Sequence, residues 1–192
     1  MPFLVAALIV GFTVYIRLHF LSMPFERDEG EYAYVGQIIL KGMIPYKDAY
    51  NMKLPGTYYL YALIEAMLGQ TDIAIRVALL IINLVSGFFV FLIAMEFLPS
   101  VFAFSAASFF CLLSVSPAAL GITANAEHFV LLFALPGIYL LLRTLRTNSV
   151  FTLLCSGFLL GLSFLMKQHA VFINCMAIVY LVISYLRVKK EL

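Results

Sequence analysis

Four carboxylates lie close together in the segment FERDEGEY, residues 25–32: Glu26, Asp28, Glu29 and Glu31. A carboxylate that is partly removed from water holds a proton more readily, and a positioned carboxylate can serve as a general base. A structural explanation also exists, because Asp28 and Glu31 are three residues apart at an expected helix start and fit a capping pattern. One cap does not require four acids, so both interpretations stay open, and Asp28 is the candidate base.

Three further ionisable side chains interrupt apolar sequence, and each has a structural and a functional interpretation. Lys53 precedes an expected helix start, where it could be a snorkelling interfacial lysine or a clamp for phosphate or carboxylate. Glu127, in ITANAEHFVLLF, could simply cap its helix. Lys167 could belong only to a polar turn with His169, although ionisable residues at membrane depth are costly and tend to mark function.

The composition indicates which elements must position these groups. The chain of 192 residues is 64% hydrophobic and 11% charged, with a mean hydropathy of +1.05. A soluble domain of this size could not bury so much apolar side chain. We therefore predict an all-α, polytopic membrane helical bundle. Six apolar segments are long enough to be candidate spans: about 3–21, 76–97, 101–118, 127–142, 150–166 and 170–186.

The longest polar stretch, about residues 22–75, is expected to form two juxtamembrane amphipathic helices. The first would run from Asp28 to Lys41 and stop at Gly42. The second would start at Pro55 and end near Leu68, before a glycine. Both could lie in the interface plane with their apolar sides toward lipid.

The placement of Lys and Arg in short loops predicts the orientation of the bundle. Arg143 and Arg146 share one side with the tail residues Arg187, Lys189 and Lys190, and that side should be cytoplasmic together with the N-terminus. Residues 22–75, 117–126 and 167–169 then fall on the extracytoplasmic side. This threading brings the unexpected ionisable groups to one face from four separate loops: Asp28, Glu29, Lys53, Glu127 and Lys167. Such a set would suit a reaction between a hydroxyl and a lipid phosphate.

Other classes of partner find little support. A net charge of +2 without a basic stripe gives no sign of nucleic-acid binding. Cys111, Cys155 and Cys175 lie inside apolar runs with no spacing typical of a metal site. We expect no cofactor and assign no metal ligand, although acids can serve as ligands for a divalent metal as well as bases. The apolar N-terminal segment is interpreted as a retained helix.

Two stretches, RDEGEYAYVGQIILKGMIPYKD and YNMKLPGTYYLYALIEAMLGQTDIAIR, resemble the first extracytoplasmic loop of GT-C glycosyltransferases. The resemblance points to the group of dolichyl-phosphate-mannose protein mannosyltransferases and aminoarabinose transferases. The family's Asp-Glu pair corresponds to Asp28 and Glu29, and its Lys-Pro-Pro-like element to Lys53-Leu54-Pro55. Its Gly and following Arg correspond to Gly69 and Arg76, its acidic position to Glu127, and its helix-terminal lysine to Lys167. Leu54 interrupts the Lys-Pro pair, and Glu127 is often Asp in relatives.

The resemblance implies a membrane glycosyltransferase that takes a sugar from a polyprenyl-phosphate donor and transfers it, with inversion, to an acceptor hydroxyl on the extracytoplasmic side. The acceptor would be a protein, a lipid or a glycan. Asp28 would be the general base, and Lys53 and Lys167 would neutralise the departing phosphate. The remaining candidates would contact the acceptor, the sugar or the lipid: Glu29, Glu127, Tyr58, Tyr59 and Tyr61.

Relatives of this kind carry more helices and a C-terminal soluble portion, so residues 1–192 are expected to be one module that is incomplete at its C-terminus. A further chain could complete the bundle. The alternatives are a non-catalytic membrane subunit, a degenerate fragment, or a transporter or flippase component. The last fits less well, since the charges lie at helix ends instead of mid-membrane. The location would be the plasma membrane in bacteria or archaea and the endoplasmic reticulum in eukaryotes.

Overall fold

A computed structural model describes residues 2–190, apart from the side chains of residues 2, 119, 145 and 187–190. Those exceptions include the tail cations Arg187, Lys189 and Lys190, so the part of the orientation prediction that depends on them lies outside the described side chains. Within the described range the chain is entirely helical apart from its loops, as predicted. The elements are α1 (Pro2–His19), α2 (Arg27–Leu40), α3 (Gly56–Leu68), α4 (Asp72–Met95), α5 (Ser100–Leu113), the 3-10 turn η1 (Pro117–Ala119), α6 (Ala126–Thr147), α7 (Val150–Met166) and α8 (Ala170–Lys190).

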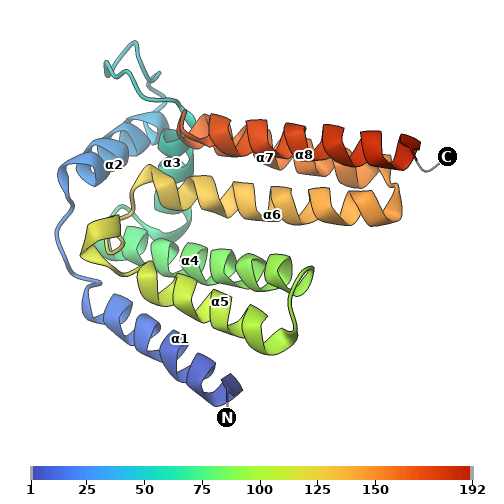
Figure 1. The fold of residues 1–192 in the computed structure, drawn as a ribbon. Helices are drawn as coiled ribbons and strands as arrows, with labels where there is room; N and C mark the ends of the chain where they lie inside the picture. Colours follow the sequence, from blue (N-terminus) through green and yellow to red (C-terminus); the bar gives the residue numbers. More distant parts are fainter. Residues whose placement is uncertain (1, 191–192) are drawn as a thin grey trace.

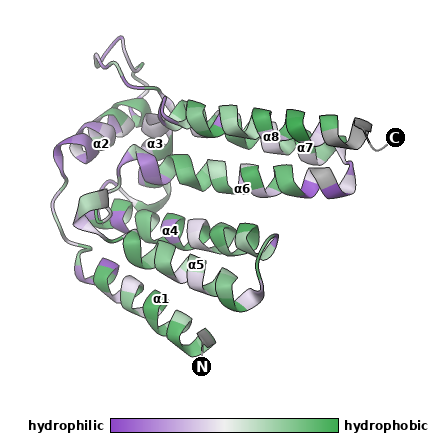
Figure 2. Cartoon of the chain, in the orientation of Figure 1, coloured by the Kyte–Doolittle hydropathy of each residue, from purple (hydrophilic) through white to green (hydrophobic). Residues whose placement is uncertain are grey.

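The longer helices form two groups that meet near α2 and α3 (Figure 1). Helices α1, α4 and α5 pack together, as do α6, α7 and α8, and α4 packs against α6 to join the groups. Apolar residues run along these helices, and polar residues gather toward their ends, especially around α2 and the start of α6 (Figure 2). The fold therefore concentrates its polar chemistry at the end that carries α2 and α3.

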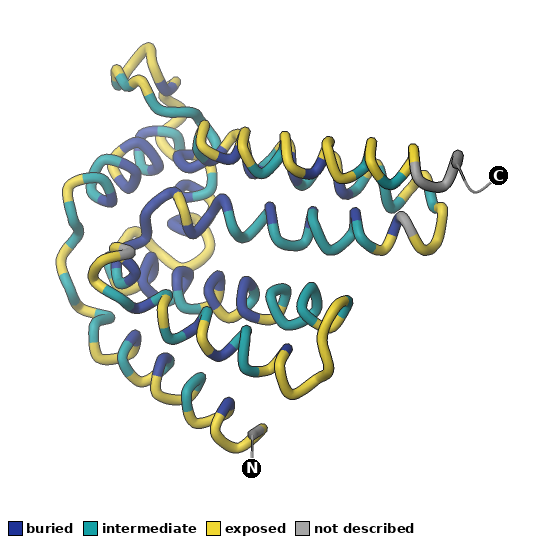
Figure 3. The backbone as a smooth tube through the Cα atoms, in the orientation of Figure 1, coloured by how far each residue is buried: buried dark blue, intermediate teal, exposed yellow. Residues whose placement is uncertain are grey.

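Two helices are long and apolar enough to cross a membrane, by length and composition, within the described residues. They are Asp72–Met95, with a mean hydropathy of 2.7, and Ala126–Thr144, with a mean hydropathy of 1.5. Four apolar helices are shorter: Phe3–His19, Ser100–Leu113, Val150–Met166 and Ala170–Leu186. Along these two long helices most residues are buried or half-buried, whereas exposed residues are frequent on α1, α7 and α8 (Figure 3). The six-span topology stays a prediction.

The predicted span 101–118 is shorter in the structure, because α5 ends at Leu113. The chain then turns through η1, where Pro117 begins the turn and Leu120 adopts a left-handed conformation with φ 48°. At about 1.5 Å per residue, 14 residues reach only about 21 Å, which is less than the hydrocarbon core of a bilayer.

Both helices of the 22–75 stretch form close to their predicted bounds. Helix α2 is followed by Gly42 with φ +79°, and α3 begins after Pro55 and ends before Gly69 with φ +98°. Glycine is favoured at both positions because side chains with a Cβ rarely adopt positive φ.

One apolar face of α2 and α3 packs inward against the other helices, and the predicted contact of these two helices with lipid stays a prediction. Tyr32 of α2 lies against Tyr61 of α3 with ring centroids 5.4 Å apart, and Tyr61 contacts Phe129 of α6 at 5.6 Å. Val35 and Ile38 are buried in the same cluster. The helix pair is thus anchored to the rest of the bundle, although apolar side chains of α3 such as Leu63 and Met67 stay exposed.

Candidate active site

A capping box built from two of the four acids starts α2. The Glu26 carboxylate accepts the backbone N–H of Asp28 at 3.0 Å, and the Glu29 carboxylate accepts the backbone N–H of Glu26 at 2.9 Å. The structural alternative of an Asp28–Glu31 cap is therefore corrected: the N-cap is Glu26, and both members of the capping box lie two residues earlier than expected. This shift leaves Asp28 and Glu31 available for other partners.

Glu29 also forms a buried ion pair with Arg76 of α4, in which both carboxylate oxygens are used. The Glu29 side chain has 0% exposure, and it also accepts the backbone N–H of Ala124. Arg76 donates to the carbonyl oxygens of Ile122 at 3.1 Å and Pro24 at 3.3 Å. Loss of either partner would leave a buried charge unpaired, which is strongly destabilising. The pair fixes the start of α2 against α4 and the segment before α6.

Lys53 extends from the loop between α2 and α3 toward the two free acids. Its Nζ lies 3.3 Å from Asp28 Oδ1 and 3.1 Å from Glu31 Oε1, and 4.5 Å from the ring centroid of Tyr32. The nitrogen itself is shielded from solvent, although a third of the side chain is exposed. The loop is held by the Tyr46 hydroxyl, which donates to the Lys53 carbonyl at 2.7 Å. Acids and lysine thus form one compact cluster.

The surroundings of this cluster shift two pKa values. Burial alone would lower the pKa of Lys53, but Glu31 and Tyr32 beside it outweigh burial, and the net shift is upward. Burial, aided by the neighbouring Glu31 carboxylate, raises the pKa of the Tyr58 hydroxyl far above its ordinary value. Lys53 is therefore firmly charged, and Tyr58 is a neutral donor.

A second lysine reaches the same region from the end of α7. Lys167 Nζ lies 2.5 Å from Glu127 Oε1 in the first turn of α6. The end of α7 docks on the start of α3, where the Thr57 hydroxyl donates to the Met166 carbonyl at 2.9 Å. Gly56 permits this approach, because a Cβ there would come within 2.5 Å of the Leu165 carbonyl oxygen.

The two lysines and Asp28 line a common cavity of about 250 Å³. Tyr32, Thr57 and Ala126 form further parts of its wall. The structure therefore brings together Asp28 of α2, Lys53 of the loop and Lys167 of the α7–α8 turn. Their separation in the sequence, from residue 28 to residue 167, means that only the fold assembles them.

The other predicted site residues do not line this cavity. Glu29 is buried against Arg76, and Glu127 holds Lys167. Tyr58 is fully buried and donates its hydroxyl to Glu31 Oε1 at 3.2 Å, whereas Tyr59 is 55% exposed. Their roles as substrate contacts remain predictions.

Glu31, Tyr32 and Thr57 were missed as members of the site. The spacing carried a signal for two of them, because positions three and four residues after Asp28 share its helix face. No comparable signal marked Thr57, whose role depends on the distant Met166.

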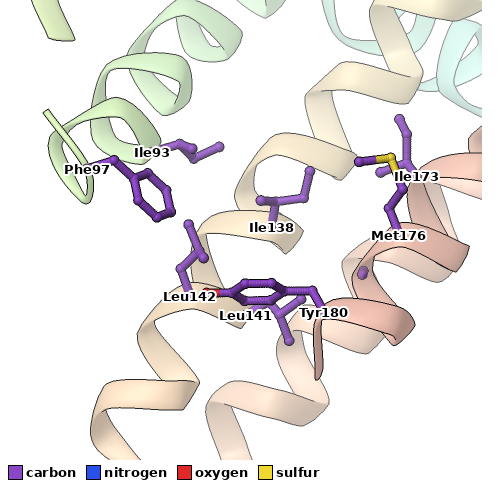
Figure 4. Close-up of a pocket in the computed structure, with 9 residues that line it drawn as sticks. Ile93, Phe97, Ile138, Leu141, Leu142, Ile173, Met176 and Tyr180 are labelled. Carbon is purple, nitrogen blue, oxygen red and sulfur yellow. The ribbon is translucent and has the colours of Figure 1, made fainter. Parts of the chain in front are cut away.

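A separate cavity of about 330 Å³ lies between α4, α6 and α8 (Figure 4). Its walls are apolar and include Ile93, Leu141, Met176 and Tyr180. It offers no acid or base and lies apart from the cavity lined by Asp28. Among the described residues no group of three or more His, Cys, Asp or Glu side chains could hold a metal ion.

Comparison with known proteins adds the family. The profile of the family described as dolichyl-phosphate-mannose-protein mannosyltransferase matches residues 52–192. No curated protein and no solved structure matches the chain. The matched range includes Lys53, Glu127 and Lys167, whereas Asp28 and Glu29 precede it. Because the match covers well over half of the chain, and the helical fold agrees with it, the chain belongs to the dolichyl-phosphate-mannose-protein mannosyltransferase family.

Proposed function

We propose that the cavity lined by Asp28, Lys53 and Lys167 transfers a sugar from a polyprenyl-phosphate donor to an acceptor hydroxyl. Family membership implies a membrane glycosyltransferase of the GT-C kind. The observation that carries the finer proposal is the placement of one carboxylate and two lysines around one cavity. A base and two cations are the groups that such a transfer needs on either side of the sugar.

The proposed reaction is a single displacement at the anomeric carbon. The acceptor oxygen forms a bond to that carbon while the bond from the carbon to the phosphate oxygen breaks, which inverts the configuration. The acceptor proton passes to Asp28, and the bonding electrons leave with the polyprenyl phosphate. Positioned bases typically contribute about 10²–10⁴-fold to such steps.

The two lysines would stabilise the departing phosphate unequally. Lys53 already faces Asp28 and Glu31, so a phosphate must compete with these carboxylates for it. Lys167 has only Glu127, whose side chain is 61% exposed and solvated. We expect Lys167 to meet the phosphate first and Lys53 to contribute as negative charge develops on the leaving oxygen.

The surrounding residues would act through these groups. Glu29, paired with Arg76, holds the helix that carries Asp28, and Glu127 orients Lys167. The exposed Tyr59 is available to contact the lipid carrier. The apolar helices support a membrane setting for the reaction, and we propose its extracytoplasmic face.

Replacement of Asp28 by Asn tests the proposal. We expect Asp28→Asn to lower transfer of labelled mannose from dolichyl phosphate mannose to acceptors in the host membrane by at least about 100-fold. The matched control is Asp72→Asn, which changes a half-buried acid at the start of α4, outside the cavity lining, and should retain activity. Full activity of Asp28→Asn would remove Asp28 from the role of base. Donor binding without transfer by the wild-type chain would favour a non-catalytic subunit.

A further inference from the structure

The two carboxylates that contact Lys53 are not equivalent. Asp28 lines the cavity, and its other charged neighbour is Arg27, whose side chain is 89% exposed. Glu31 does not line the cavity. It lies one helical turn further along α2 and makes the shorter contact with Lys53, at 3.1 Å against 3.3 Å for Asp28.

Glu31 is also fixed from a second side. The hydroxyl of the fully buried Tyr58 donates to Glu31 Oε1, the same oxygen that faces Lys53. Tyr58 cannot move easily, because its ring packs on Tyr32 with centroids 5.9 Å apart. A carboxylate that accepts a hydrogen bond from a rigid donor is held in one orientation, whereas Asp28 has only charged, more mobile partners.

We propose that Glu31, held by Tyr58, is the permanent counter-ion that positions Lys53, so that Asp28 can give up its contact with Lys53 and act as the base. This inference rests on the proposed function. Without Glu31, the ammonium of Lys53 would turn to Asp28 as its one remaining carboxylate. A carboxylate paired with an ammonium accepts a proton less readily. Glu31 is therefore a positioning residue, not a catalytic one.

The first experiment measures Lys53 itself and does not depend on catalysis. Lys53 of the full chain in nanodiscs is acetylated competitively across an alkaline pH series, and its peptide is quantified by mass spectrometry. Because Glu31 contributes to the raised pKa of Lys53, we expect Glu31→Gln to increase the labelling rate several-fold. Glu31→Asp, which retains the charge, should increase it less, and Asp28→Asn should have a smaller effect than Glu31→Gln. Besides Asp28 and Glu31, other titratable or charged groups lie around Lys53 and are the same in all of these variants, so they do not account for a difference in labelling. They are Arg27, Tyr32, Tyr46, Tyr58, Glu127 and Lys167.

The second experiment separates positioning from folding by kinetics. Glu31→Gln should lower kcat by at least about tenfold. This is a part of the rate enhancement that a positioned general base supplies, because Asp28 would still be present but paired with Lys53. The KM for dolichyl phosphate mannose should not rise, because removal of a negative charge near the cavity favours an anionic donor. Tyr58→Phe should change kcat in the same direction by less. The control Glu26→Gln alters an acid that only caps α2. It should not lower kcat while leaving KM unchanged.

The outcomes are distinct. Unchanged labelling of Lys53 in Glu31→Gln, or an equal increase in Asp28→Asn, would overturn the assignment of Glu31, as would an unchanged kcat. If the wild-type chain transfers no sugar, the proposed function fails, and the labelling series alone decides whether Glu31 is the partner of Lys53.

Discussion

At the scale of single residues, the two lysines of the cavity should differ in what their loss does. Lys53 neutralises two carboxylates, so its removal would leave Asp28 at the cavity wall and Glu31 beside it without this cation, and both would repel a phosphate. Loss of Lys167 leaves only Glu127, which water already solvates. The charge that remains at the cavity after each substitution, more than the lost contact between lysine and phosphate, should therefore decide how much phosphate binding weakens.

We expect Lys53→Ala to weaken binding of radiolabelled dolichyl phosphate by about 10–100-fold, the range for a hydrogen bond to a charged group. Lys167→Ala should weaken it less. Lys47→Ala, an exposed lysine in the same loop, is the matched control. Scintillation proximity measurements on the protein in nanodiscs give the affinities, and melting curves show whether folding is intact. Unchanged affinity in Lys53→Ala would argue against the phosphate clamp.

At the scale of elements, the end of α2 and both ends of α3 were predictable because their start and stop signals are local. Gly42, Pro55 and Gly69 act on their own neighbours in sequence. The capping register and the buried Glu29–Arg76 pair were not predictable, because they depend on α4 packing against the start of α2. Similarly, the docking of α7 on α3 at Gly56 is a contact between distant segments that no periodicity reveals.

The packing of α2 on α3 carries one feature that should cost stability. Glu65 of α3 is 3% exposed and lies against Gly36 of α2, and its Oε2 has no hydrogen-bond partner. The Gln37 amide donates to its other oxygen at 3.4 Å. Burial raises the pKa of Glu65, and Gln37 lowers it in part. Because the pKa of Glu65 is higher in the folded state than its ordinary value of 4.5, Glu65 stabilises the folded state fully at pH values below 4.5. This contribution is lost as the pH rises through the pKa that Glu65 has in the folded state.

Glu65→Gln should therefore raise the Tm at neutral and alkaline pH, because it removes a buried carboxylate that ionises there. The gain should shrink as the pH falls toward the ordinary pKa of the carboxyl, 4.5. Thermal unfolding in detergent over a pH series measures this dependence. The matched control is Glu96→Gln, whose carboxylate already pairs with Arg146 at 2.7 Å and whose loss should bring no gain. A lower Tm for Glu65→Gln at every pH would contradict the interpretation.

At the scale of the whole molecule, the helices alternate in direction, so the 43–55 loop, η1 and the α7–α8 turn lie at the same end (Figure 1). This arrangement agrees with the sequence-based threading, which relied on apolar segment lengths and short polar breaks. The assembly of the cavity follows from that alternation, since Lys53 and Lys167 reach one space from separate turns. Which end faces the cytoplasm depends on loop charges, and it stays a prediction.

Cysteine accessibility decides the orientation. In a background without Cys111, Cys155 and Cys175, single cysteines replace Asp48, Gln168 or Thr147, all exposed. We expect a membrane-impermeant maleimide to label the first two in intact cells, because both lie at the end that carries the cavity. Thr147→Cys, in the turn between α6 and α7 beside the basic Arg143 and Arg146, should react only after permeabilisation. Labelling of positions 48 and 168 from opposite sides would contradict a shared cavity, because the loop and the α7–α8 turn could then not meet. The reverse pattern at all three positions would keep the cavity but move the chemistry to the cytoplasmic face, where a lipid-phosphate donor would have to be presented from the inner leaflet.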